Sequence, residues 1–137
     1  MGLVVDASIA AKWVLRDEAS ASANALLSTV IREGALVPGI FPFEIENILA
    51  VAERRRRLEA ADVAAALALL KSLRFTVDPF VPAQMGRHLD LARRFGLSTY
   101  DAAYVSLAAR EGATLFTADA QLEAAARALG ITTVCAP

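Results

Sequence analysis

The sequence has little cysteine and histidine and no long apolar run, and each shortage excludes a class of protein. The one cysteine, Cys135, cannot form a disulfide within the chain, so we expect a reducing, cytoplasmic location. The one histidine, His88, offers no cluster for zinc and is expected to lie on a helix. No apolar stretch approaches the ~20 residues that span a bilayer, so no membrane is expected. The first residues also lack the basic and then apolar pattern of an export signal.

Several catalytic motifs and a strong net charge are also missing. The sequence contains no P-loop and no G-x-G-x-x-G, and a lone histidine gives no basis for a Ser-His-Asp set. A net charge of −1 does not by itself indicate nucleic acid. Basic residues are nevertheless clustered in two places: Arg54, Arg55, Arg56 and Arg57 in one, and Arg87, His88, Arg93 and Arg94 in the other. Solvated helix surface accounts for both clusters, and contact with a phosphate backbone is the alternative.

Length and apolar content predict one domain over residues 1–137, large enough for a core without disulfides or a structural metal. Hydrophobic residues make up 56% of the chain, which predicts an apolar surface that a partner or a second copy covers. Much of this fraction is alanine and therefore also indicates helix.

Short apolar segments alternate with segments of helical periodicity. This alternation predicts an α/β/α fold, in which helices flank a short, mostly parallel sheet. The expected strands are 3–5, 35–37, 75–78, 114–117 and 131–134. The expected helices are 7–15, 18–32, 42–53, 60–73, 82–95, 98–112 and 120–129, with 60–73 broadly buried.

Four acidic positions stand at junctions between a strand or loop and a helix. Asp6 follows the first strand, Asp101 lies in the first turn of its helix, and Asp119 follows the strand 114–117. The remaining acid is Glu44 or Glu46, which flank the apolar stripe of one helix, so periodicity does not choose between them. Each acid also has a simpler explanation as a helix cap or as a first-turn charge favoured by the helix dipole.

A parallel sheet would bring these acids together, because ligands bind where the carboxyl ends of its strands meet at a change of strand order. Carboxylates gathered there repel one another, and a hard cation such as Mg²⁺ or Mn²⁺ removes that repulsion. Such a cation suits phosphodiester hydrolysis by a metal-activated water. The hydroxyls of Ser8 and Thr117 are candidates to orient a carboxylate or that water, or to serve only in capping. RNA would be attracted by arginines at the rim, from Arg54–Arg57 or Arg93–Arg94.

The order of these segments resembles the PIN-domain family, and within it the VapC-like ribonuclease toxins of toxin–antitoxin pairs. The similar segments are Val4-Val5-Asp6-Ala7-Ser8, the P-x-x-x-x-x-E-x-x-N-x-L pattern from Pro38 to Leu49, the stretch Leu97–Tyr104 around Asp101, and Thr117-Ala118-Asp119. The resemblance assigns the second acid to Glu44. It implies that Asp6, Glu44, Asp101 and Asp119 are catalytic metal ligands.

The resemblance further implies an Mg²⁺- or Mn²⁺-dependent endoribonuclease that cuts structured RNA such as tRNA or rRNA. It also implies a homodimer and a cognate antitoxin whose tail covers the site. The alternative is a catalytically silent PIN-like module that binds RNA or protein. A phosphatase with a strand-end aspartate nucleophile is a weaker reading, because Ser8 stands where a second aspartate is expected.

Overall fold

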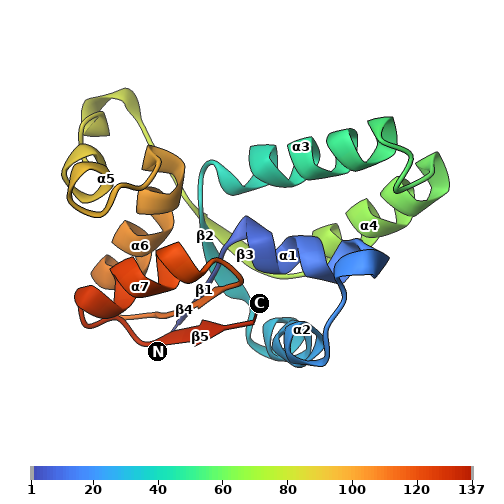
Figure 1. The fold of residues 1–137 in the computed structure, drawn as a ribbon, viewed down its shortest axis with the longest axis horizontal. Coiled ribbons are helices and arrows are strands. Elements are labelled where there is room, and N and C mark those ends of the chain that lie inside the picture. Colours follow the sequence, from blue (N-terminus) through green and yellow to red (C-terminus); the bar gives the residue numbers. More distant parts are fainter. Residues whose placement is uncertain (1, 137) are drawn as a thin grey trace.

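The computed structural model describes residues 2–136 and has a central sheet of five parallel strands in the order β3-β2-β1-β4-β5 (Figure 1). In chain order the strands are β1 (Leu3–Val5), β2 (Ala35–Pro38), β3 (Phe75–Asp78), β4 (Thr114–Thr117) and β5 (Thr133–Cys135). The expected α/β/α class and parallel sheet are confirmed, with the last strand beginning two residues later than expected.

Helices flank the sheet, as expected of an α/β/α fold (Figure 1). In chain order they are α1 (Ala7–Val14), η1 (Arg16–Glu18), α2 (Ala21–Glu33), α3 (Phe41–Arg54), α4 (Ala60–Ser72), η2 (Pro82–Gln84), α5 (Leu89–Phe95), α6 (Thr99–Glu111) and α7 (Ala120–Ala128). Helix α6 packs on β1 and β2, and α7 packs on β4 and β5. None of the helices in residues 2–136 has the length and apolar character needed to cross a membrane.

The strand order reverses between β1 and β4. The chain proceeds from β1 outward to β2 and β3, then crosses back to β4 and continues to β5. Val4, Val5 and Leu115, on the two central strands, are fully buried. A parallel sheet that reverses its order leaves a crevice at the carboxyl ends of the strands on either side of the reversal. Here those strand ends carry Asp6 and Thr117.

The expected helix 82–95 is wrong in its first half. Residues 82–84 form a short 3₁₀ turn, and the α-helix begins only at Leu89. Gly86 between them has φ +99°, a conformation that continues neither helix. Similarly, α2 begins at Ala21 with the Ser20 side chain as its N-cap rather than at residue 18.

The expectation that helix 60–73 is broadly buried is also wrong. Within α4 only Ala66 and Leu70 are buried, although apolar residues occupy nearly every position. The alanine-rich composition reflects helix propensity here rather than a position inside the core.

Candidate active site

Asp6 lies at the reversal point and is only 4% exposed. Its backbone N–H donates to the carbonyl of Phe116, which extends the pairing of β1 with β4 to the strand end. Oδ1 accepts from the Ser8 hydroxyl at 2.5 Å and from the Ile9 N–H at 3.2 Å, and Oδ2 accepts from the Thr117 hydroxyl at 2.6 Å. Burial raises the pKa of Asp6, and these hydrogen bonds oppose the rise because they favour the charged form.

Thr117 connects Asp6 to Asp119. Its fully buried hydroxyl donates to Asp6 and accepts from the backbone N–H of Asp119 at 3.0 Å. Ser8 makes a parallel link, since its hydroxyl donates to Asp6 and accepts from the Ala118 N–H at 3.0 Å. The two hydroxyls therefore tie the ends of β1 and β4 together around one carboxylate.

The structure distinguishes Glu44 from Glu46. Glu46 is exposed, whereas Glu44 is half-buried and accepts a hydrogen bond from the Tyr104 hydroxyl at 2.6 Å. Burial raises the pKa of Glu44, and the charges of Asp101 and Asp6 raise it further, while the Tyr104 hydrogen bond lowers it. Of these two glutamates, only Glu44 faces the acids at the strand ends.

Asp101 and Asp119 complete the group from α6 and α7. Burial raises the pKa of Asp101, the charge of Asp119 raises it further, and the Ser98 hydroxyl lowers it. Asp101 also raises the pKa of Asp6 through its charge. The four acids thus influence one another electrostatically, although they come from segments far apart in the sequence.

The helix-cap explanation of these positions is correct as well. Asp6 caps α1, and Asp119 Oδ1 caps α7 by accepting from the N–H groups of Gln121 and Leu122. Ser98 caps α6 by accepting from the Asp101 N–H at 3.0 Å. In a parallel α/β fold the helices begin at the carboxyl edge of the sheet, so a carboxylate that caps a helix can also belong to a site at that edge.

The donors suit a hard divalent cation in kind, since carboxylate and hydroxyl oxygens are the ligands that Mg²⁺ and Mn²⁺ prefer. Glu44 Oε2 and Asp119 Oδ2 accept no hydrogen bond from residues 2–136. Within that range no three acidic, histidine or cysteine side chains are arranged to hold an ion in the conformation shown. Coordination by this group therefore requires the side chains to move from this conformation.

The two arginine clusters lie in different parts of the fold. Arg54 lies ten residues beyond Glu44 on α3, about 15 Å along the helix axis. Arg57 forms ion pairs with Asp17 at 2.8 Å and Glu18 at 2.7 Å, so it is already partnered. Arg57 is thus engaged in ion pairs, and a place for Arg54, Arg55 and Arg56 at the rim of the site stays a prediction.

The end of α5 contacts the start of α7. Gly96, two residues after Arg94, accepts a hydrogen bond from the Gln121 side chain, and Gln121 is two residues after Asp119. Arg93 is exposed and lies 3.5 Å from Asp90, and the Arg94 guanidinium lies over the Phe95 ring. The role of Arg93 and Arg94 as RNA contacts stays a prediction, which the contact of Gly96 with Gln121 makes spatially reasonable.

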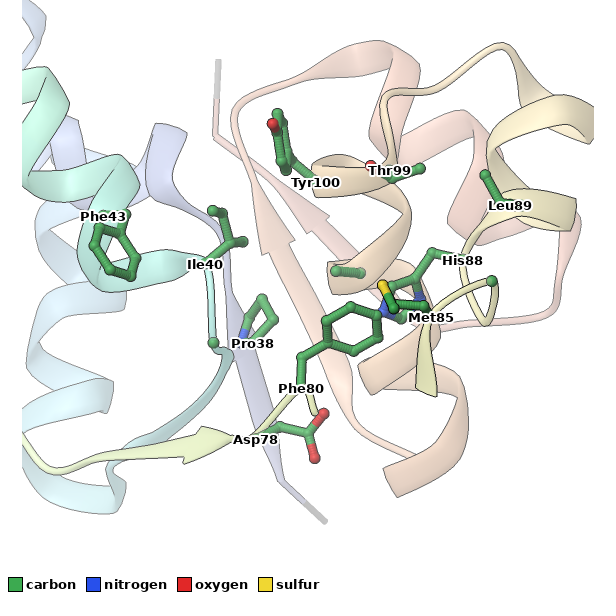
Figure 2. A pocket seen from close by; sticks show the side chains of 13 residues that line it. Pro38, Ile40, Phe43, Asp78, Phe80, Met85, His88, Leu89, Thr99 and Tyr100 are labelled. Carbon is green, nitrogen blue, oxygen red and sulfur yellow. The ribbon is translucent and has the colours of Figure 1, made fainter. Parts of the chain in front are cut away.

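An apolar cavity of about 430 Å³ lies between the starts of α3 and α6 and the segment 78–89 (Figure 2). Ile40 and Phe43 border it from the start of α3, and Tyr100 borders it from the start of α6. Phe80 and His88 stack on its floor with ring centroids 5.1 Å apart. His88 is the N-cap residue of α5, just outside the helix on which it was expected, and its ring packs against Phe80.

Tyr104 is the residue of this site that sequence reasoning missed. It is 1% exposed and reads as an ordinary core aromatic in the sequence. The available signal was its spacing, because a residue three positions after Asp101 on a helix lies on the same face.

The fold and the crevice define a doubly wound α/β protein with an acidic site at its strand ends. The model of the PIN domain family matches residues 3–128, and the chain belongs to this family. PIN domains are generally nucleases and typically use divalent metal ions. The crystal structure of PAE2754 from Pyrobaculum aerophilum is similar at 27% identity and a TM-score of 0.72, over 98% of this chain and 91% of that one. The search of curated proteins gives no match.

Proposed function

We propose that this chain is an Mg²⁺- or Mn²⁺-dependent endoribonuclease that acts as the toxin of a toxin–antitoxin pair. The observation that carries the nuclease proposal is the group of four mutually repelling carboxylates at the reversal point of the sheet. Burial and repulsion raise the pKa of Asp6, Glu44 and Asp101, so the charged forms are unfavourable without a counter-ion. A divalent cation held by Asp6, Glu44, Asp101 and Asp119 would supply that charge and lower the pKa of its bound water.

The chain's own residues position the cation and the substrate. Ser8 and Thr117 hold the Asp6 carboxylate in one orientation. Arg93 and Arg94 supply positive charge beside an otherwise acidic crevice, which a polynucleotide needs in order to approach. Structured RNA such as tRNA or rRNA is the proposed substrate class.

The test is cleavage of a mixed tRNA and rRNA substrate with Mn²⁺ by paired variants. Glu44→Gln should reduce the rate at least tenfold, as should Asp6→Asn and Asp101→Asn. Glu46→Gln, two residues away on the same helix but exposed, should cleave at the wild-type rate. Wild-type activity in the folded Asp6→Asn variant would refute the assignment of the site.

A silent PIN-like module is the second candidate, since the fold alone does not require catalysis. The presence of all four acids favours the nuclease. Their mutual repulsion destabilises the fold, and a protein that binds no cation gains nothing from keeping them together. Calorimetry with Mn²⁺ separates the two. A chain that binds no Mn²⁺ at millimolar concentration is a module.

We also propose that a second copy of the chain covers the apolar cavity face, making a homodimer. Large apolar side chains are exposed around it: Phe43 at 70%, Met85 at 74%, and also Val77, Phe80, Val81, Leu89 and Tyr100. An apolar concentration of this kind is typical of a protein interface. In light scattering, Met85→Lys should shift the chain to monomer, whereas Val134→Lys, on β5, should not. A wild-type monomer at high concentration would refute the dimer.

The toxin role adds a cognate antitoxin whose tail lies across the acidic crevice. Expression of the wild-type chain should stop growth, and expression of Asp101→Asn should not. Co-expression of a small protein encoded beside the gene should restore growth and co-purify with the chain. Growth arrest by the inactive variant would show that toxicity does not come from cleavage.

A further inference from the structure

The buried phenol of Tyr104 joins the two long helices that carry candidate ligands. Tyr104 lies on α6, and its hydroxyl reaches Glu44 Oε1 on α3 at 2.6 Å. A buried tyrosine hydroxyl requires a partner, and backbone carbonyls are the usual choice. Here the partner is instead a carboxylate at the edge of the acidic crevice.

The contact with Tyr104 engages one of the two carboxylate oxygens of Glu44. Glu44 is half-buried, and Tyr104 is the side chain within residues 2–136 that donates a hydrogen bond to it. The bond occupies Oε1 and leaves Oε2 without a protein donor. One turn earlier on the same face of α6, Asp101 contributes its charge to Glu44, and Asp6 does so from β1. The second oxygen is therefore the one whose lone pairs are all free to share an ion with these acids.

We propose that Tyr104 is a positioning residue that holds Glu44 by Oε1, so that Glu44 offers a cation one oxygen, Oε2. This inference rests on the proposed metal-dependent function. Partners that orient a ligand in this way commonly change metal affinity by 10- to 100-fold when they are removed.

A purely structural tyrosine would predict something different. In both cases Tyr104→Phe loses a buried hydrogen bond and some stability. Only a positioning role makes the loss of metal affinity depend on Glu44. A double-mutant cycle measures that dependence directly.

The experiment is calorimetric titration of the metal-free chain with Mn²⁺, after circular dichroism shows that each variant is folded. Tyr104→Phe should weaken Mn²⁺ binding about tenfold. Thr114→Val is the control, because it removes a hydroxyl that makes no side-chain hydrogen bond within residues 2–136, and it should bind Mn²⁺ like the wild type. In a Glu44→Ala background, adding Tyr104→Phe should change the affinity less than twofold.

Two outcomes overturn the inference while the proposed function stands. One is wild-type Mn²⁺ affinity in Tyr104→Phe, and the other is an equal loss with and without Glu44. If Tyr104→Phe does not fold, Glu44→Asp replaces it, because the shorter side chain keeps its charge but draws away from the phenol. Wild-type affinity in Glu44→Asp overturns the inference too. A wild-type chain that binds no Mn²⁺ refutes this inference and the proposed nuclease together.

Discussion

The Thr117 hydroxyl offers a sharp test of how the two central strands are joined at the site. Thr117→Val keeps the shape of the side chain but removes the donor to Asp6 and the acceptor for the Asp119 N–H. A hydrogen bond to a charged group contributes about 1.5–3 kcal/mol, and leaving a buried partner unsatisfied adds to the loss. We therefore expect the free energy of unfolding to fall by about 2–3 kcal/mol at pH 7.

The assay is urea unfolding, with Thr114→Val as the matched control. Thr114 lies on the same strand, and its side chain makes no hydrogen bond within residues 2–136, so its replacement should change stability by less than about 0.5 kcal/mol. For a chain of this size the expected loss in Thr117→Val corresponds to a fall in Tm of roughly 6–10 °C. A Thr117→Val variant as stable as Thr114→Val would refute the reasoning.

The stability difference between Thr117→Val and wild type should also change with pH, in a direction that the hydrogen bond to Asp6 determines. The Thr117 hydrogen bond lowers the pKa of Asp6, so its stabilisation is present while Asp6 is ionised and is lost as Asp6 becomes protonated. Because burial raises the pKa of Asp6 above the ordinary 3.8, this loss begins at a higher pH than for an exposed aspartate. The stability difference between Thr117→Val and wild type should therefore shrink from pH 7 towards acid. A difference that is constant with pH would contradict this account.

Three further predictions follow from the described contacts. Asp101→Asn should raise the stability of the metal-free chain at pH 7, on the order of 0.5 kcal/mol. Because the pKa of Asp101 is raised, this gain should appear as the pH rises past the ordinary carboxyl range and vanish in acid, measured by urea unfolding. Gly34→Ala should lower the free energy of unfolding by at least ~2 kcal/mol, because Gly34 has φ +75° and a Cβ there would lie 2.7 Å from the Arg74 carbonyl oxygen. Gly112→Ala, at φ +58° with open space around the added Cβ, should lower it by about 1 kcal/mol in the same measurement. Saturating Mn²⁺ should raise the Tm of wild type and leave that of Asp6→Asn unchanged in a thermal scan.

Helix and strand positions were predictable because they depend on local periodicity and on caps within a few residues. The strand 3–5, the Ser98 cap and the turn at Gly112 can each be read from neighbouring residues. The expected helix 82–95 failed for a local reason as well, since Gly86 interrupts it with a backbone conformation that no apolar pattern reports.

Which carboxylates meet could not be predicted from periodicity, because that depends on contacts between distant segments. Glu44 and Glu46 flank the same stripe of α3, and only the tertiary fold brings the Tyr104 hydroxyl of α6 to one of them. The Arg54–Arg57 run likewise looks available in the sequence, but the return of the chain beside η1 pairs Arg57 with Asp17 and Glu18.

The sequence by itself therefore determined the elements, the α/β class and the strand-end acids, because each depends on residues close together in the chain. The tertiary structure decided the strand order, the choice of Glu44, the hydroxyl link from Asp6 through Thr117 to Asp119, and the pairing of Arg57 with Asp17 and Glu18. These follow from which segments pack side by side, and that is set by burial of the whole apolar core.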